Sequence, residues 1–205
     1  MQFVLKSIVS LKTWYLYNVI ESSNKWDSKF DLISHTNAVS EITFWKENII
    51  KLNRRNISCH DWQSDLKVHS DASDYALGVV LDNGFTCHRK LTNEEQIQSS
   101  TYREIIAILH GLRVFIDVFK GKKVDWFVDN SAASSIVKKG SAKLYLHKIA
   151  VEIYGITSTN DVHLNVSWVP RELNTTADLL SKYVDVDDWE ITMELFEVWI
   201  NCGVH

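Results

Sequence analysis

Residues 67–81 read KVHSDASDYALGVVL, and this stretch decides how the chain is interpreted. Its two apolar runs are typical of β-strands joined by a short connection. Two aspartates, Asp71 and Asp74, lie between the runs. They are either turn formers, because Asp bonds readily to nearby backbone, or carboxylates at a strand end that face a functional cleft. The choice depends on what the rest of the chain places beside them.

The composition is that of an ordinary globular protein with one main domain. The 205 residues are 45% hydrophobic and 23% charged, and the formal net charge is −4. Contacts with nucleic acid must therefore come from local clusters of positive charge. Three widely spaced cysteines and no signal-peptide pattern predict reduced thiols and an intracellular location, cytoplasmic or nuclear. Charged residues interrupt the apolar N-terminal stretch, so we expect no membrane segment.

Periodicity predicts a helical extension over residues 1–65. Residues 1–22 are expected to be helical, and residues 40–54 form an amphipathic helix. The predicted apolar face of that helix consists of Ile42, Trp45, Ile49 and Leu52. Glu41 is expected to lie away from this face.

From Leu66 the period changes, which predicts an α/β domain over 66–185 and leaves a C-terminal helical tail over 186–205. The predicted strands are 66–72, 75–82, 84–90, 124–129 and 162–169, and the predicted helices are 99–119, 131–139, 142–158 and 175–183. Asp82-Asn83-Gly84 is a hairpin turn signal. This βββαβαβα order with one extra helix predicts a mixed five-stranded sheet flanked by helices.

Four acidic residues occupy comparable places on four successive elements. Asp71 and Asp129 end predicted strands, Glu104 lies in the first turn of the long helix, and Asp178 opens the last helix. Because the crevice of an α/β sheet lies beyond the carboxyl ends of its strands, these side chains can meet there.

Each acid also has a purely local explanation. Asp71 can end a hairpin, and Glu104 can close a capping box that begins at Thr101. Asp129 can cap the next helix, and Asp178 can stabilise its own helix by its charge near the positive end of the helix dipole. Taken together, these explanations do not account for the shared placement of all four.

Four converging carboxylates would repel one another unless divalent cations supplied the opposite charge. Two hard cations on oxygen ligands are a known arrangement for phosphodiester hydrolysis. Mg²⁺ suits such ligands and Mn²⁺ can substitute, whereas the chain has no Cys/His cluster that would favour zinc. The pattern therefore predicts metal-dependent phosphoryl chemistry.

The motifs SDASDYALGVVL, TYREIIAILHGL, WFVDNSAA and NTTADLLSK, in this order, resemble the ribonuclease H domain of retroelement reverse transcriptases. The flanking segments SEITFWKENIIKLNRRNI and VDVDDWEITMELF are similar to those of DIRS-type, tyrosine-recombinase retrotransposons. The resemblance implies endonucleolytic hydrolysis of the RNA strand of an RNA/DNA hybrid with two Mg²⁺ ions. It also implies that the helical extension over 1–65 is similar to a polymerase thumb or connection. The catalytic metal ligands that it implies are Asp71, Glu104, Asp129 and Asp178.

Polar residues beside the acids are candidates for contact with the hybrid. The candidates for 2′-hydroxyl contacts are Ser73, Asn130 and Ser131, and those for phosphate contacts are Arg103, Lys138, Lys139, Lys143 and Arg171. Turn formation and a solvated helix face are the alternatives for these residues. A second expected partner is the reverse transcriptase domain of the same polyprotein.

The chain departs from the family pattern in one loop and leaves two other functions open. Many members have a histidine before the last helix, whereas this loop reads Pro170-Arg-Glu-Leu-Asn174. No Tyr-x-Asp-Asp signature occurs, so the chain does not itself copy RNA and is a polyprotein fragment or a free-standing descendant. One alternative is a binding or scaffolding module with weak or no nuclease activity. The other is a different nuclease of the same fold, although an exonuclease predicts Asp-x-Glu where Asp71-Ala-Ser73 stands.

Overall fold

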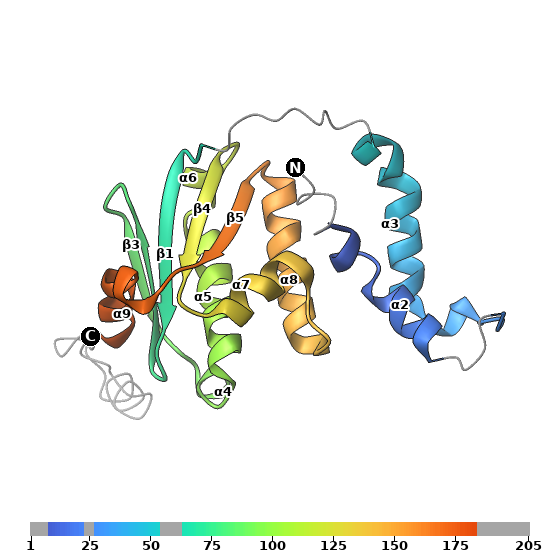
Figure 1. Cartoon of the computed structure of the whole chain (residues 1–205), viewed down its shortest axis with the longest axis horizontal. Coiled ribbons are helices and arrows are strands. Elements are labelled where there is room, and N and C mark those ends of the chain that lie inside the picture. The colour runs from blue at the N-terminus through green and yellow to red at the C-terminus, as the bar shows by residue number, and fades with distance from the viewer. Residues whose placement is uncertain (1–7, 23–26, 54–62, 184–205) are drawn as a thin grey trace, which may run out of the picture.

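The computed structural model describes residues 8–22, 27–53 and 63–183. Its centre is a five-stranded sheet of order β3-β2-β1-β4-β5 (Figure 1). The strands are β1 (Leu66–Ala72), β2 (Ala76–Leu81), β3 (Thr86–Lys90), β4 (Lys123–Val128) and β5 (His163–Trp168). The first three strands pair antiparallel, and β1, β4 and β5 pair parallel. This topology confirms the predicted mixed sheet.

The helices of the α/β domain cover both faces of this sheet (Figure 1). They are α4 (Asn93–Gln96), α5 (Ser100–Val114), α6 (Ile116–Phe119), α7 (Ser131–Lys139), α8 (Leu144–Thr159) and α9 (Thr175–Lys182), with a 3-10 turn η2 (Arg171–Leu173) before α9. The long helix predicted over 99–119 is interrupted at Phe115, whose ψ of 20° departs from the helical value. Helix α9 packs on β1 and β2, on the face opposite α5.

The core lies between the sheet and the layer of α5, α7 and α8. In β4 the residues Val124, Trp126 and Val128 are fully buried, as period-2 alternation requires. The indole of Trp126 fits against Gly111 of α5, where a Cβ would lie 2.8 Å from the ring. Its Nε1–H donates to Ser70 Oγ at 2.8 Å, so the buried ring leaves no polar atom without a partner.

The N-terminal part of the described chain is helical, but its packing differs from the prediction. It consists of α2 (Trp14–Glu21), η1 (Leu32–Ser34) and α3 (Thr36–Asn53). The predicted apolar face of α3 is confirmed in part: Leu52 is buried and Trp45 is half-buried, whereas Ile42 is 40% and Ile49 is 54% exposed. Glu41, expected to lie away from the packed side, is buried instead.

The capping of α2 by Glu41 explains this difference. The Glu41 carboxylate accepts hydrogen bonds from the backbone N–H groups of Tyr15 at 3.1 Å and Leu16 at 2.8 Å. First-turn amides have no partner within their own helix, so a carboxylate stabilises them. This polar contact determines which side of α3 packs on α2.

The N-terminal helices also contact the α/β domain through α8. The Trp14 ring stacks on the His147 ring with centroids 4.8 Å apart, and Lys12 Nζ lies 5.7 Å from the centroid of the Tyr154 ring. His147 is fully buried.

The domain boundary near residue 65 stays a prediction, and the predicted tail over 186–205 lies outside the described residues. Within the described ranges, no helix combines the length and apolarity that crossing a bilayer requires.

Candidate metal centre

Three of the four predicted acids meet at the edge of the sheet where β1 and β4 end. Asp71 belongs to β1, Asp129 directly follows β4, and Glu104 lies on α5. One carboxylate oxygen from each of the three lies within 4.8 Å of the other two. Because β1 and β4 are parallel neighbours, their carboxyl ends lie at the same edge, which brings the two aspartates together.

The structure removes three of the local explanations for these acids. Asp71 lies inside β1, opposite Gly78, and not in a turn. The N-cap of α5 is Ser99, and the capping box lies on α4, so Glu104 does not close one. Asn130 caps α7 by accepting a hydrogen bond from Ala133 N–H at 2.9 Å, so Asp129 is not a cap.

Glu104 carries a buried oxygen that nothing in the described chain satisfies. Its Oε1 accepts a hydrogen bond from Ala72 N–H at 3.3 Å, whereas its Oε2 is buried without a hydrogen-bond partner. Burial, followed by repulsion from Asp71 and Asp129, raises the pKa of Glu104 well above its ordinary value of 4.5. A buried carboxylate oxygen without a donor is costly, and a divalent cation would satisfy it.

Asp71 is equally buried but has a hydrogen-bond donor. Burial raises the pKa of Asp71, and the charges of Asp129 and Asp178 raise it further. The hydroxyl of Ser181 donates to Asp71 Oδ2 at 2.5 Å and opposes this rise. Sequence reasoning missed Ser181, although it follows Asp178 by three residues and therefore shares the face of α9 that lies on the sheet.

Asp178 lies beside the three acids, but its carboxylate is paired with two basic side chains. It accepts hydrogen bonds from Lys182 Nζ at 2.6 Å and from Arg171 Nε at 3.1 Å. These bonds, with that of Lys182 the larger, lower the pKa of Asp178. Arg171 Nε also lies 3.9 Å from Asp129 Oδ2, so this guanidinium bridges two of the four acids.

Two of the predicted substrate residues have side chains that are engaged inside the protein. Ser73 Oγ donates to Ser181 O at 2.7 Å and accepts from the N–H groups of Tyr75 and Ala76. The guanidinium of Arg103 is buried and donates to the carbonyls of Gln96 and Gln98 and to Asp74. These contacts order the loops around the acids.

The other predicted substrate residues differ in exposure. Asn130 is half-buried as the cap of α7, and Ser131 is exposed at the first position of that helix. Arg171 is exposed beside the acids. Three lysines predicted to contact phosphate lie at the end of α7 and just before α8. Lys138 is half-buried, and Lys139 and Lys143 are exposed.

Asn174 also supports the site, and sequence reasoning did not identify it. Its side chain is 1% exposed, and its Nδ2 donates to Ser70 O at 2.9 Å. Its Oδ1 lies 3.2 Å from His69 Nδ1. These bonds fix the loop before α9 to β1, next to Asp71.

Residues 61–153 match the model of a protein family described as the RNase H-like domain found in reverse transcriptase. The matched residues include Asp71, Glu104 and Asp129, whereas Asp178 lies beyond them. The predicted resemblance is thereby confirmed at this level. No curated protein matches the chain significantly.

Several solved structures are similar to the chain. RNase H1 from the halophilic archaeon Halobacterium salinarum NRC-1 is 18% identical, with 56% of this chain and 92% of that one covered at a TM-score of 0.48. LC11-RNase H1 in complex with RNA/DNA hybrid is 16% identical, with 56% and 91% covered and a TM-score of 0.47. A foamy viral protease-reverse transcriptase in complex with double-stranded DNA is 15% identical, with 78% and 30% covered and a TM-score of 0.40.

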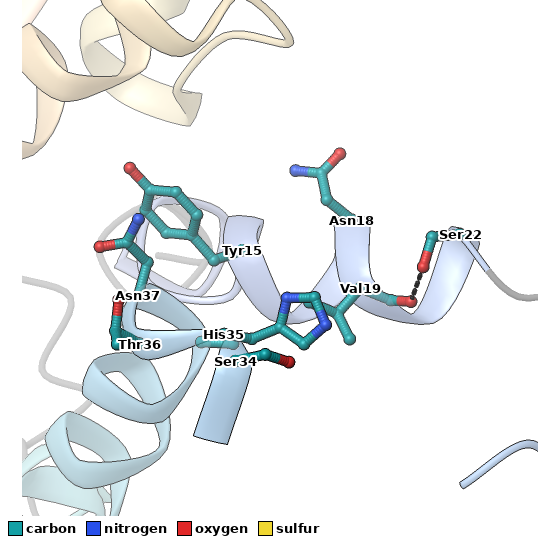
Figure 2. A pocket seen from close by; sticks show the side chains of 9 residues that line it. Tyr15, Asn18, Val19, Ser22, Ser34, His35, Thr36 and Asn37 are labelled. Atoms are coloured by element: carbon teal, nitrogen blue, oxygen red, sulfur yellow. Dashed lines mark hydrogen bonds between the residues drawn. The ribbon is translucent and has the colours of Figure 1, made fainter. Parts of the chain in front are cut away.

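A separate cavity of about 330 Å³ lies between α2 and α3, away from the acids. Figure 2 shows Tyr15, Asn18, His35 and Asn37 among the side chains around it. His35 and Asn37 are exposed. The cavity contains none of the acids of the metal centre.

Proposed function

We propose that the chain is a metal-dependent ribonuclease H that cuts the RNA strand of RNA/DNA hybrids. The observation that carries this proposal is the buried Glu104 Oε2, which has no hydrogen-bond partner among the described residues and belongs to a cluster of three carboxylates. Such a cluster fits a hard divalent cation on oxygen ligands, which is the preference of Mg²⁺ and Mn²⁺. The family match to an RNase H-like domain supports the same activity.

Asp71, Glu104 and Asp129 would hold the first cation, and Asp178 is proposed as a ligand of the second. Bound Mg²⁺ supplies an activated water and stabilises the leaving oxygen in phosphodiester hydrolysis. The main chain of Ala72 orients Glu104 through its N–H group, and Ser181 orients Asp71. These contacts hold the carboxylates in place before the metal binds.

Arg171 is proposed to contact the substrate phosphate. Its guanidinium is exposed in the loop where many family members carry a histidine, and it lies beside Asp129 and Asp178. A guanidinium suits phosphate because it presents several donors in a planar fork. Ser131 and Asn130 at the start of α7 are proposed to contact the 2′-hydroxyl that distinguishes RNA from DNA.

The finer assignment to DIRS-type retroelements is proposed on the segments that flank the domain in the sequence. The reverse transcriptase domain of the same polyprotein is then the proposed partner, and the cytoplasm or nucleus the proposed location. The family description, an RNase H-like domain found in reverse transcriptase, supports this partner.

A labelled RNA/DNA hybrid incubated with the full chain and Mg²⁺ tests the activity. We expect cleavage of the RNA strand by the wild type and none by Asp129→Asn, which removes one carboxylate of the cluster. Asp117→Asn is the matched control, because Asp117 is an exposed acid on α6 and should be dispensable.

Failure of a folded wild-type chain to cut hybrid with either Mg²⁺ or Mn²⁺ would contradict the proposed function. The absent loop histidine and the pairing of Asp178 with Arg171 and Lys182 would then favour the binding or scaffolding module. Cleavage of duplex DNA in preference to hybrid would favour another nuclease of the same fold.

A further inference from the structure

Helix α9 lies unusually close to β2. A Cβ on Gly78 of β2 would lie 2.8 Å from Ser181 N and 2.9 Å from Leu180 Cβ. Because glycine has no Cβ, the backbone of α9 can approach the strand that pairs with β1. Gly78 is the register partner of Asp71, so the closest approach occurs beside the metal centre.

Ser181 is the residue that this approach brings to Asp71. Its side chain is fully buried, and its Oγ lies 2.5 Å from Asp71 Oδ2. On its other side, Ser181 O accepts the hydroxyl of Ser73, which follows β1. The serine is therefore tied to β1 through its side chain and through its main chain.

The hydroxyl of Ser181 has a second acceptor, the carbonyl of Asp178 at 2.9 Å. Bonding to the carbonyl one turn back is common for serine in helices and requires no functional role. A hydroxyl has only one proton, and a carboxylate is a stronger acceptor than a carbonyl. The bond to Asp71 should therefore predominate.

We propose that Ser181 is a positioning residue that fixes the rotation of the Asp71 carboxylate and so raises the affinity of the metal centre for divalent cations. One Asp71 oxygen is engaged by the hydroxyl, which prevents the carboxylate from turning away from Glu104 and Asp129. This inference rests on the proposed metal site. It adds to that site a residue that neither the acidic motifs nor the family match assigns.

Direct binding of Mn²⁺ to the full chain, followed by electron paramagnetic resonance, tests the proposal without relying on cleavage. We expect Ser181→Ala to bind Mn²⁺ about 10-fold more weakly, the loss typical when a partner of a metal ligand is removed. Cleavage should need correspondingly more metal, whereas the KM for hybrid at saturating metal should stay unchanged.

Ser134→Ala is the matched control. Ser134 is also a buried helical serine whose hydroxyl donates to a main-chain carbonyl, that of Val166 at 3.1 Å, but it does not contact the acids. We expect it to keep wild-type Mn²⁺ affinity even if its melting temperature falls. Ser181→Cys replaces the hydroxyl with a somewhat larger thiol that is a weaker donor, and it should reproduce the loss if Ser181→Ala does not fold.

Two results would overturn the inference. The first is wild-type Mn²⁺ affinity in a folded Ser181→Ala or Ser181→Cys chain, and the second is an equal loss of affinity in Ser134→Ala. Failure of the proposed function has a different signature. A wild-type chain whose Mn²⁺ affinity depends on Ser181 but that cuts no hybrid would leave this inference standing, whereas a wild-type chain that binds no Mn²⁺ would end both.

Discussion

Glu104 and Asp178 belong to the same proposed site, yet their surroundings are opposite. Glu104 is buried, one of its oxygens has no hydrogen-bond partner in the part of the chain that the structure describes, and burial raises its pKa. Asp178 lies at the rim, and its bonds to Lys182 and Arg171 lower its pKa. The buried acids therefore depend on a cation from solution, whereas Asp178 already has its counter-charges within the chain. We expect the first metal ion to bind at the buried acids. Asp178 should become a metal ligand only after its carboxylate releases Lys182 and Arg171.

The largest expected effect is that of Glu104→Gln. Hybrid cleavage should fall by more than about 100-fold, because even indirect partners of metal ligands contribute 10- to 100-fold. The metal-free protein should nevertheless become more stable, since the amide removes a buried charge and keeps an oxygen for Ala72 N–H. Cleavage rates and melting temperatures in chelator measure the two effects. A loss of both activity and stability would contradict the contrast with Asp178.

Gly78→Ala is expected to have the next largest effect, because it separates α9 from the buried acids. The added Cβ meets the main chain of Ser181, and such overpacking costs about 1–3 kcal/mol. Melting temperature, Mn²⁺ affinity and cleavage should all fall. The control is Gly155→Ala on α8, where a Cβ meets nothing within 4 Å. That substitution should stabilise the helix by up to about 1 kcal/mol, and an equal loss in both variants would contradict the close approach of α9.

The pH dependence of metal-free stability should separate the two kinds of acid. Folded Glu104 binds its proton more tightly than the unfolded chain does, so its contribution is full below pH 4.5 and is lost as the pH rises through its raised pKa. Asp178 has the opposite sign, and its contribution is present above pH 3.8 and is lost as the pH falls. We expect the melting temperature in chelator to decline above pH 4.5 and Glu104→Gln to weaken that decline. An unchanged slope in Glu104→Gln would contradict the assignment.

Lys182→Ala should have the smallest effect. The pair of Lys182 with Asp178 spans one helical turn and is partly exposed, so its loss should cost about 0.5 kcal/mol or less. Release of Asp178 should slightly strengthen Mn²⁺ binding. Metal titrations at low and high salt measure this, because salt weakens the ion pair and should reduce the difference from wild type. A large loss of metal affinity would show that Lys182 supports the site instead of competing with the cation.

Strand β4 and the first part of β1 were predictable because burial on one face gives a period of two that the segment itself displays. The limits of β1 match the prediction over 66–72, and α7 matches over 131–139. The single helix expected over 99–119 was wrong only at Phe115, where the chain turns between two helices with one continuous apolar pattern. Three of the four acids meet as expected, and for Asp71 and Asp129 the reason is that the carboxyl ends of neighbouring parallel strands are adjacent.

The packing of α3 was only partly predictable from its apolar period, which indicated the buried Leu52 but not the buried Glu41. Glu41 of α3 is buried because its carboxylate accepts hydrogen bonds from first-turn N–H groups of α2. No pattern within α3 reveals that these N–H groups lie beside it. The same holds for Ser181, whose partner Asp71 is 110 residues away along the chain. Its position on α9 was visible, but its contact was not.

The amino-acid order alone was enough to derive the succession of strands and helices, the placement of four acids at element ends and the oxygen-ligand chemistry that these acids allow. These properties follow from local periodicity and residue type, which each segment carries on its own. The folded chain was needed to show that Glu104 has a buried oxygen with no partner among the described residues, that Asp178 is paired with Arg171 and Lys182, and that Ser181 contacts Asp71. Burial and charge pairing depend on which distant segments pack together, and that is a property of the whole fold.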